Sequence, residues 1–207
     1  MKVLVIGAGN MGAGFVKQLA AAGHQVSVTA RDIAKAQAVA QQFGATAVPA
    51  NNAASTADAV VVATPYGEAA AALRSVGARA GTVVIDITNP LTPDYMGLTL
   101  GHSTSAAEEI AQAVPGAEVV KGFNTVFAQV LAAGANLDGQ KVTVFLASDS
   151  ERAKQTAKAL AESMGFKTLD AGGLKNARYL EPLAGLNIYF GYGAGLGTAV
   201  APAWIGS

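Results

Sequence analysis

The first thirty residues place the strongest constraint on the fold. An apolar run at residues 3–6 leads directly into the glycine-rich turn GAGNMG at residues 7–12. Good helix formers follow over residues 13–22, Gly23 stops that helix, and a second apolar strand occupies residues 25–30. This spacing predicts a strand–helix–strand unit with parallel strands. The chain therefore belongs to the α/β class of folds.

In such a unit, the glycine-rich turn is suited to the pyrophosphate of a dinucleotide. Gly7 allows a sharp turn, Gly9 lets the backbone approach the phosphates, and Gly12 lets the helix press against the sheet. The helix directs unpaired N–H groups and the positive end of its dipole toward the anion. Glycine makes up 24 of 207 residues, so the flanking strand and helix are what give the motif its weight. We expect the pyrophosphate to contact Gly7, Ala8, Gly9, Asn10, Met11 and Gly12.

The rest of the chain alternates apolar runs with helical patterns. This predicts a Rossmann-type, doubly wound, mostly parallel sheet with helices on both faces. Strands are expected at residues 2–6, 25–30, 45–48, 59–63, 82–87, 118–121, 142–147 and 167–170. Helices are expected at residues 10–22, 33–43, 66–76, 104–113, 150–164 and 174–190. No linker divides the chain, so we expect one domain over 1–207, with one continuous sheet over about 1–170 and a C-terminal helical segment over about 171–207.

The tip of the second strand indicates which ribose the turn serves. Arg31 is placed to neutralise the 2′-phosphate of NADP, with Thr29 as a hydroxyl donor and Lys35 as a second cation. Asp32 has two interpretations, because it stands where an NAD-binding acid is found and also where the next helix needs an N-cap. The local chemistry favours NADP over NAD.

Two further strand ends lie at the carboxyl edge of the predicted sheet. The fourth strand ends at Thr64 and Pro65, and the fifth ends at Asn89 and Pro90. Ligands of open α/β sheets bind at that edge, so we expect these four residues to contact the nicotinamide half of the cofactor. The alternative is that the prolines only end their strands and that Asn89 caps a turn.

The C-terminal segment is unusual because it carries no charged residue from Pro182 to Ser207. Its many glycines and Pro202 disfavour a membrane helix. We expect instead a buried helix, a wall of the cofactor site or a subunit interface. An apolar surface of that size is usually covered, which predicts a homodimer.

The composition excludes several classes of function. Lys plus Arg and Asp plus Glu number 14 each, so no basic field attracts nucleic acid or an anionic membrane. There is no cysteine and there are only two histidines, so we expect no disulfide, no thiolate chemistry and no metal site. The apolar strand that follows Met1 directly predicts no signal peptide, and a cytoplasmic location is expected.

Other polar side chains offer no clear catalytic dyad. His24 and His102 are expected to be solvated. Arg178 and Glu181, one helical turn apart, are expected to form a surface ion pair. Lys121 is the candidate proton donor if the substrate is an imine or carbonyl, although a structural role is preferred.

Several separate segments together resemble one enzyme family. They are GAGNMG at residues 7–12, TARD at 29–32, VVIDITNPL at 83–91, VPGAEVVKGFNT at 114–125 and LDAGGL at 169–174. In this order, they resemble the NADP oxidoreductases typified by NADPH:deazaflavin (coenzyme F-420) oxidoreductase. The NADPH domain of the six-transmembrane ferric reductases is similar. The resemblance spans nearly the whole chain.

This resemblance implies hydride exchange between NADPH and a flavin or deazaflavin, with the two rings stacked and no metal. It also implies that Phe123 and Asn124 join Thr64 and Asn89 around the nicotinamide. Ring-to-ring transfer needs proximity more than an acid or base, so no catalytic residue is assigned. Phe123, Tyr189, Phe190 and Tyr192 are candidates for stacking on the acceptor, although aromatics at helical spacing are more often in the core.

Two alternatives remain open. The GxGNMG turn is also similar to that of pyrroline-5-carboxylate reductase, an imine reductase, but that enzyme builds its site with a further helical dimerisation domain, which we do not expect here. The other alternative is a redox partner or sensor that binds NADPH without turnover.

Overall fold

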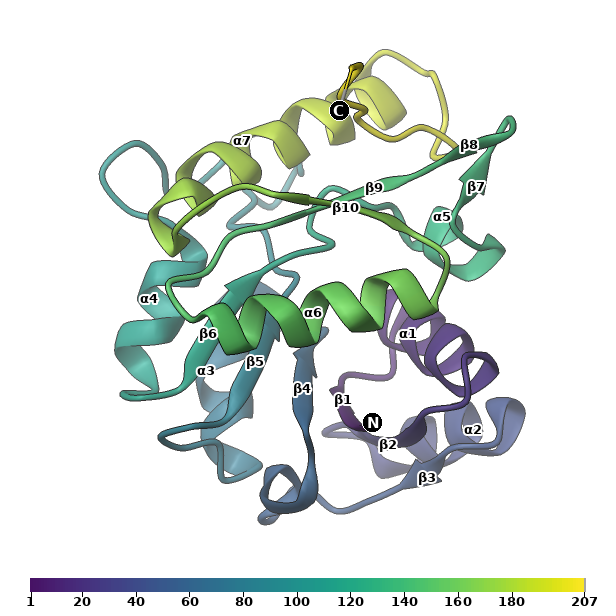
Figure 1. Cartoon of the computed structure of the whole chain (residues 1–207), viewed down its shortest axis with the longest axis vertical. Coiled ribbons are helices and arrows are strands. Elements are labelled where there is room, and N and C mark those ends of the chain that lie inside the picture. Colours follow the sequence, from purple (N-terminus) through teal and green to yellow (C-terminus); the bar gives the residue numbers. More distant parts are fainter. Residues whose placement is uncertain (207) are drawn as a thin grey trace.

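The computed structural model describes residues 1–206 and has at its centre a six-stranded parallel sheet (Figure 1). Ser207, the last residue of the predicted domain and of the charge-free segment, lies outside the described residues. In spatial order, the strands are β3 (Thr46–Ala47), β2 (Gln25–Thr29), β1 (Lys2–Ile6), β4 (Ala59–Val62), β5 (Val83–Asp86) and β6 (Glu118–Lys121). The order reverses between β1 and β4, which confirms the predicted Rossmann-type, doubly wound sheet.

Helices cover both faces of this sheet because alternate strand residues point to opposite sides. Val3 and Val5 pack with α1 (Asn10–Ala21), α2 (Ile33–Phe43) and α6 (Glu151–Ser163). Leu4 and Ile6 pack on the other face with α3 (Tyr66–Ser75) and α4 (Ala106–Ala113). These bounds agree with the predicted helices to within about two residues, the usual uncertainty of helix ends.

Polar side chains set the starts of three helices. The Asp32 carboxylate accepts a hydrogen bond from the Ala34 N–H at 3.1 Å, as expected of an N-cap. Ser105 accepts from the Glu108 N–H at 3.2 Å, and Ser150 accepts from the Ala153 N–H at 3.1 Å. The N-cap interpretation of Asp32 is therefore confirmed.

The prediction that the last two strands continue the same sheet is wrong. β9 (Thr143–Leu146) and β10 (Lys167–Asp170) form a separate parallel pair. Among the described residues, a single antiparallel bridge, between Lys121 and Ala147 just after β9, joins this pair to β6. The reason is the path between β6 and β9, which contains α5 (Ala128–Ala133) and the hairpin of β7 (Asn136–Leu137) and β8 (Gln140–Lys141). These elements were too short to predict, and they return the chain to β6 in the opposite direction.

The predicted C-terminal helical segment is present. A 3₁₀ turn, η2 (Leu174–Asn176), leads into α7 (Ala177–Ile188), and a π-helical turn, η3 (Tyr189–Gly193), ends it. A second 3₁₀ turn, η1 (Ala53–Thr56), precedes β4. In Figure 1, α7 lies over β9 and β10, and Leu180 packs against Phe145 of β9 and against Ala147, which follows β9. None of the helices described within residues 1–206 is long and apolar enough to cross a membrane.

Candidate functional site

The glycine-rich turn contains two glycines that the fold itself requires. Gly7 has a φ of +116°, and a Cβ on it would lie 2.3 Å from the carbonyl oxygen of Ala63. A Cβ on Gly12 would lie 1.9 Å from the carbonyl oxygen of Gly7. The absence of a side chain at these two positions lets the start of α1 lie close against the ends of β1 and β4. Gly7 and Gly12 therefore serve the close packing expected of the motif.

Gly9 differs because, apart from its two chain neighbours, no residue that the structure describes has an atom within 4 Å of where its Cβ would be. Nothing in the protein itself requires a glycine there, so the open space in front of it is available to a ligand. Gly9 also precedes α1, which has no side-chain cap, so the first-turn N–H groups have no side-chain partner. An anion such as a pyrophosphate fits this position, since it would supply the missing acceptors.

A cavity of about 890 Å³ opens in front of this turn. It lies at the carboxyl ends of β1, β4 and β5, beside the point where the strand order reverses, as ligand sites of open α/β sheets do. Its walls are formed by Gly9, Asn10, Met11, Ala63, Thr64, Pro65, Tyr66, Ile87, Thr88, Asn89, Leu91, Asp94, Tyr95, Met96 and Tyr192. The turn and the predicted strand ends at Thr64, Pro65 and Asn89 thus meet in one place.

Two buried hydroxyl groups in the wall of the larger cavity have no hydrogen-bond partner among the described residues. They belong to Thr64 and Thr88. Buried polar atoms are normally satisfied, so unpartnered ones beside a cavity indicate a place for a polar ligand. The carboxamide and ribose of a nicotinamide nucleotide carry such groups.

Asn89 does more than cap a turn, because its side chain pairs with Asn124 across the cavity wall. The Asn89 amide nitrogen donates to the Asn124 carbonyl oxygen at 2.9 Å, and the Asn124 amide nitrogen donates to Asn89 Oδ1 at 3.0 Å. Asn124 also donates to the Leu180 carbonyl oxygen on α7 at 2.9 Å. Pro90 is buried, does not line the cavity, and accepts a hydrogen bond at its carbonyl from the Thr99 N–H at 2.7 Å.

Phe123 lies mostly in the core. It is 1% exposed and has a φ of +60°, the left-handed region that a bulky residue seldom adopts. Its ring makes edge contacts with Phe15 and Phe166, at centroid distances of 5.0 and 5.8 Å. Phe123 borders a second, smaller cavity, but its ring is held mainly by these core contacts.

The second cavity has a volume of about 240 Å³ and adjoins the first. Both cavities share the walls formed by Asn10, Met11, Ile87, Asn89, Leu91, Tyr95 and Tyr192. The smaller one extends toward residues 123–129 and toward Ala184, Asn187 and Ile188 of α7. A ligand in the larger cavity would therefore leave space for a second ligand beside it, in the smaller cavity.

The aromatic residues of the C-terminal segment are exposed rather than buried, contrary to the preference for a core position. Tyr189, Phe190 and Tyr192 are 52%, 41% and 59% exposed. Of these three, Tyr192 lines the cavities, and its ring makes an edge contact with Phe127. Tyr95, from the loop after β5, lines both cavities from another side and was not predicted.

The residues predicted to select the ribose separate into two groups. Arg31 and Lys35 are exposed beyond the tip of β2, and Arg31 Nη1 lies 3.1 Å from Glu68 Oε1 on α3. Thr29 is 2% exposed, and its buried hydroxyl lacks a hydrogen-bond partner among the described residues. Glu68 carried no signal in the sequence, because its contact with Arg31 depends on how α3 lies beside β2.

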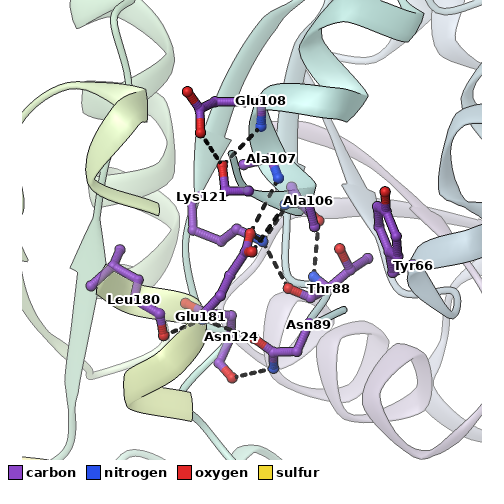
Figure 2. A network of polar contacts seen from close by, with 12 residues as sticks. Tyr66, Thr88, Asn89, Ala106, Ala107, Glu108, Lys121, Asn124, Leu180 and Glu181 are labelled. Atoms are coloured by element: carbon purple, nitrogen blue, oxygen red, sulfur yellow. Dashed lines mark hydrogen bonds and ion pairs between the residues drawn. The ribbon is translucent and has the colours of Figure 1, made fainter. Parts of the chain in front are cut away.

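Lys121 is completely buried in a cluster of charged side chains (Figure 2). Its ammonium lies 2.6 Å from Asp86 Oδ2 and 2.8 Å from Glu181 Oε1, and it donates to the Thr88 carbonyl oxygen at 2.7 Å. All the donor capacity of this ammonium is thus used inside the protein. Lys121 lines neither cavity, which supports the structural role preferred for it over a role as proton donor.

The predicted surface pair of Arg178 and Glu181 is wrong. Glu181 is 1% exposed, contacts Lys121, and accepts hydrogen bonds from the Ala106 and Ala107 N–H groups at 2.9 and 3.2 Å. Arg178 instead pairs with Glu108, with Nη2 2.7 Å from Oε1. The helical spacing was correct, but α7 packs against α4 and β6, and partners from those elements replace the local pair.

Tyr66 closes the cavity wall at the start of α3. Its hydroxyl donates a hydrogen bond to the Glu109 carboxylate on α4. Burial raises the pKa of Tyr66 well above its usual value, and the hydrogen bond to Glu109 raises it further. Tyr66 therefore stays protonated at any physiological pH. Because its hydroxyl proton is donated to Glu109, Tyr66 is not a candidate for a catalytic acid.

The two histidines lie away from the cavities. His102 is exposed. His24 is half-buried, with Nε2 2.8 Å from Ser163 Oγ and Nδ1 3.1 Å from the N-terminal nitrogen. Burial, followed by the nearby N-terminal charge, lowers the pKa of His24.

Comparisons with known proteins agree with this geometry. Residues 2–90 match the family model of NADP oxidoreductase, coenzyme F420-dependent. The F420-dependent NADP reductase of Methanothermobacter marburgensis is 32% identical over 210 residues, covering 91% of each chain. Metalloreductase STEAP3 of Rattus norvegicus is 38% identical over 104 residues, which are 50% of this chain and 20% of that protein. The matched half of this chain thus corresponds to about a fifth of the length of that metalloreductase.

Solved structures extend the likeness to the whole fold. A crystal structure of a candidate F420-dependent NADP reductase from Arthrobacter sp. FB24 has a TM-score of 0.85, with 28% identity and coverage of 99% of this chain and 100% of the other. An imine reductase from Pseudomonas sp. has a TM-score of 0.69 at 20% identity, covering 94% of this chain and 63% of the other, which shows a shared fold alone. The chain belongs to the coenzyme F420-dependent family of NADP oxidoreductases and is an NADP-dependent oxidoreductase.

Proposed function

We propose that this oxidoreductase transfers a hydride between NADP(H) and a flavin or deazaflavin. The observation that carries the proposal is the pair of adjoining cavities at the carboxyl edge of the sheet, which share the walls at Asn10, Asn89, Tyr95 and Tyr192. One cavity suits a dinucleotide, and the other leaves room for a second planar ring beside it. Hydride transfer needs the donor and acceptor carbons in contact more than it needs an acid or base.

In this proposal, the larger cavity holds the cofactor. The backbone at Gly9 and the N–H groups at the start of α1 bind the pyrophosphate, while Arg31 and Lys35 neutralise the 2′-phosphate. Thr64, Thr88 and the Asn89–Asn124 pair face the nicotinamide end, and the unpartnered hydroxyls of the two threonines support this placement. Bound NADPH supplies the hydride from its nicotinamide ring, and the residues around the ring hold it in place.

The acceptor then lies in the smaller cavity and extends outward. Tyr95 and Tyr192 are 62% and 59% exposed at its mouth, and rings in such places bind flat aromatic partners by stacking. Two relatives carry the name F420-dependent NADP reductase, which favours a deazaflavin as the partner. The enclosed part of the cavity, about 240 Å³, is smaller than typical ligand pockets, so much of a three-ring acceptor would remain near the surface.

Anaerobic oxidation of NADPH tests this function, with coenzyme F420, FMN, FAD and pyrroline-5-carboxylate offered separately. We expect turnover with at least one of the flavin-type acceptors. Turnover with the imine alone would contradict the proposal and favour an imine reductase. Tight NADPH binding without reduction of any acceptor would instead indicate a binding protein or electron-handing partner.

We also propose that the chain forms a homodimer through its C-terminal segment and works in the cytoplasm. Support comes from the exposed apolar side chains in a stretch without charge, among them Leu186, Leu196 and Ile205. Light scattering at micromolar concentration should give the mass of a dimer. A monomer under these conditions would contradict the dimer.

A further inference from the structure

The buried cluster around Lys121 connects the C-terminal helix to the wall of the cofactor cavity (Figure 2). Its members come from four elements: Asp86 ends β5, Lys121 ends β6, Glu181 lies on α7, and the Ala106 and Ala107 N–H groups begin α4. Asp86, Lys121 and Glu181 are separated by 35 and 60 positions in the sequence, and all three side chains are 0–2% exposed. A buried ion cluster of this kind is costly to assemble, so it is weak evidence for stability as such.

The cluster holds both polar backbone groups of one residue, Thr88. Asp86 Oδ1 accepts from the Thr88 N–H at 2.9 Å, and the Lys121 ammonium donates to the Thr88 carbonyl oxygen at 2.7 Å. Thr88 lines the larger cavity and directly precedes Asn89, which lines both cavities. The position of this part of the wall is therefore fixed by side chains that touch neither cavity.

Glu181 determines where the Lys121 ammonium lies. Its two oxygens are held by the N–H groups at the start of α4, and Oε1 also lies 2.8 Å from Lys121 Nζ, which has Asp86 as its other carboxylate partner. Without that pull, the ammonium would move toward Asp86, since a buried charge must keep a partner. The bond to the Thr88 carbonyl would then change in length and direction. Because Asn124 also donates to the Leu180 carbonyl, α7 holds Asn124 directly, and it reaches Asn89 only through Lys121 and Thr88.

We infer that Glu181 and Lys121 are positioning residues for the nicotinamide ring. They act through Thr88 and Asn89, and they fix which face of the ring is turned toward the acceptor. This inference rests on the proposed function, because it takes the nicotinamide to lie against Asn89. A misplacement of about 1 Å at such a wall is enough to lower the rate of hydride transfer about a hundredfold.

The chain offers a matched control for a test of Glu181. Glu108 on α4 and Arg178 on α7 form an ion pair between two helices that Glu181 also joins, and Figure 2 shows Glu108 apart from Thr88. Glu181→Gln and Glu108→Gln each remove one charge from the contact between the same two helices. Only Glu181→Gln disturbs Lys121.

The experiment compares the two variants with the unaltered protein by four measurements. The first is cofactor binding, measured as the dissociation constants of 2′,5′-ADP and of NADPH. The second is kcat with the best acceptor, and the third is the transfer of deuterium from (4R)- and (4S)-deuterated NADPH. The fourth is hydrogen exchange of residues 86–90 without ligand. For Glu181→Gln, we expect unchanged 2′,5′-ADP binding, kcat lower by about tenfold or more, mixed stereochemistry of transfer and faster exchange. Glu108→Gln should match the unaltered protein in all four.

A Glu181→Gln variant that keeps full stereospecificity and protected exchange would overturn the inference. If this variant does not fold, a neutral cluster with Asp86→Asn, Lys121→Met and Glu181→Gln replaces it, because uncharged replacements of buried ion clusters often fold well. The same two readouts decide the outcome for that variant. If the unaltered protein fails to bind NADPH, the proposed function fails, whereas the exchange comparison still shows whether the cluster holds residues 86–90.

Discussion

Arg31 and Glu68 form an exposed ion pair at the edge of the proposed cofactor site, with Arg31 Nη1 3.1 Å from Glu68 Oε1. The Arg31 side chain is 86% exposed, so the pair contributes little to stability. Its interest is functional, because a 2′-phosphate bound by Arg31 would take the place of the Glu68 carboxylate. The two residues lie on different elements, with Glu68 in the first turn of α3 and Arg31 just beyond the tip of β2.

Arg31→Ala should weaken NADPH binding far more than NADH binding. Loss of a charge-assisted phosphate contact costs about 1.5–3 kcal/mol, which is about ten- to a hundredfold in the dissociation constant. Titration of the bound nicotinamide fluorescence with each cofactor measures the difference. An equal loss for both cofactors would mean that the ribose site lies elsewhere.

Glu68→Gln should have the opposite effect on NADPH. Removal of the competing carboxylate frees Arg31 and reduces repulsion of the 2′-phosphate, so NADPH should bind up to about fivefold more tightly. The gain should be smaller at high salt, because exposed charges are screened. NADH affinity serves as the internal control and should not change. Weaker binding of NADPH would show that Glu68 itself contacts the cofactor.

Substitutions of two glycines in the turn should affect thermal stability and cofactor binding separately. Gly12→Ala places a Cβ 1.9 Å from the Gly7 carbonyl and should lower the thermal midpoint strongly or prevent folding. Apart from its two chain neighbours, Gly9→Ala meets no atom of the described residues within 4 Å and should leave the thermal midpoint nearly unchanged. It should nevertheless weaken both NADPH and NADH, since the methyl group occupies the space proposed for the pyrophosphate. Unchanged cofactor binding by Gly9→Ala would contradict that placement.

The Glu108–Arg178 pair predicts a pH dependence of stability. The Arg178 hydrogen bond lowers the pKa of Glu108 below its ordinary value of 4.5, with a smaller contribution from Ser105. The stabilisation is therefore complete above that value and is lost as the pH falls below it. The unaltered protein should be slightly more stable than Glu108→Gln at pH 7, and the two should converge toward pH 3. Chemical denaturation at several pH values measures this difference, and a constant gap would contradict it.

Much of the fold was predictable because its signals are local. Each of α1, α2 and α6 begins beside a glycine, Asp or Ser that is visible in the sequence, and each buries one stripe of apolar residues. Parallel strands buried on both faces appear as continuous apolar runs. The short elements between β6 and β9 gave no comparable signal, so the detour that separates β9 and β10 from the main sheet was missed.

The candidate site divides in the same way. The glycine turn, Thr64, Pro65 and Asn89 were found because each follows directly from a strand end, and the cavity brings them together. Tyr95 and Thr88 were missed, since no local pattern marks a loop tyrosine or a second threonine as part of a wall. Pro90 and Phe123 were predicted from their neighbours, but one is buried behind the cavity and the other packs mainly in the core.

By itself, the sequence determined the Rossmann-type unit, its glycine-rich turn and the family, because all three depend on residues close together along the chain. Only the tertiary structure decided the partners of Glu181, Lys121 and Arg178. Helical spacing sets which side chains share a face, but burial decides which charge each must meet. Glu181 lies 60 positions from Lys121, and packing of α7 on α4 and β6 brings the two within 2.8 Å.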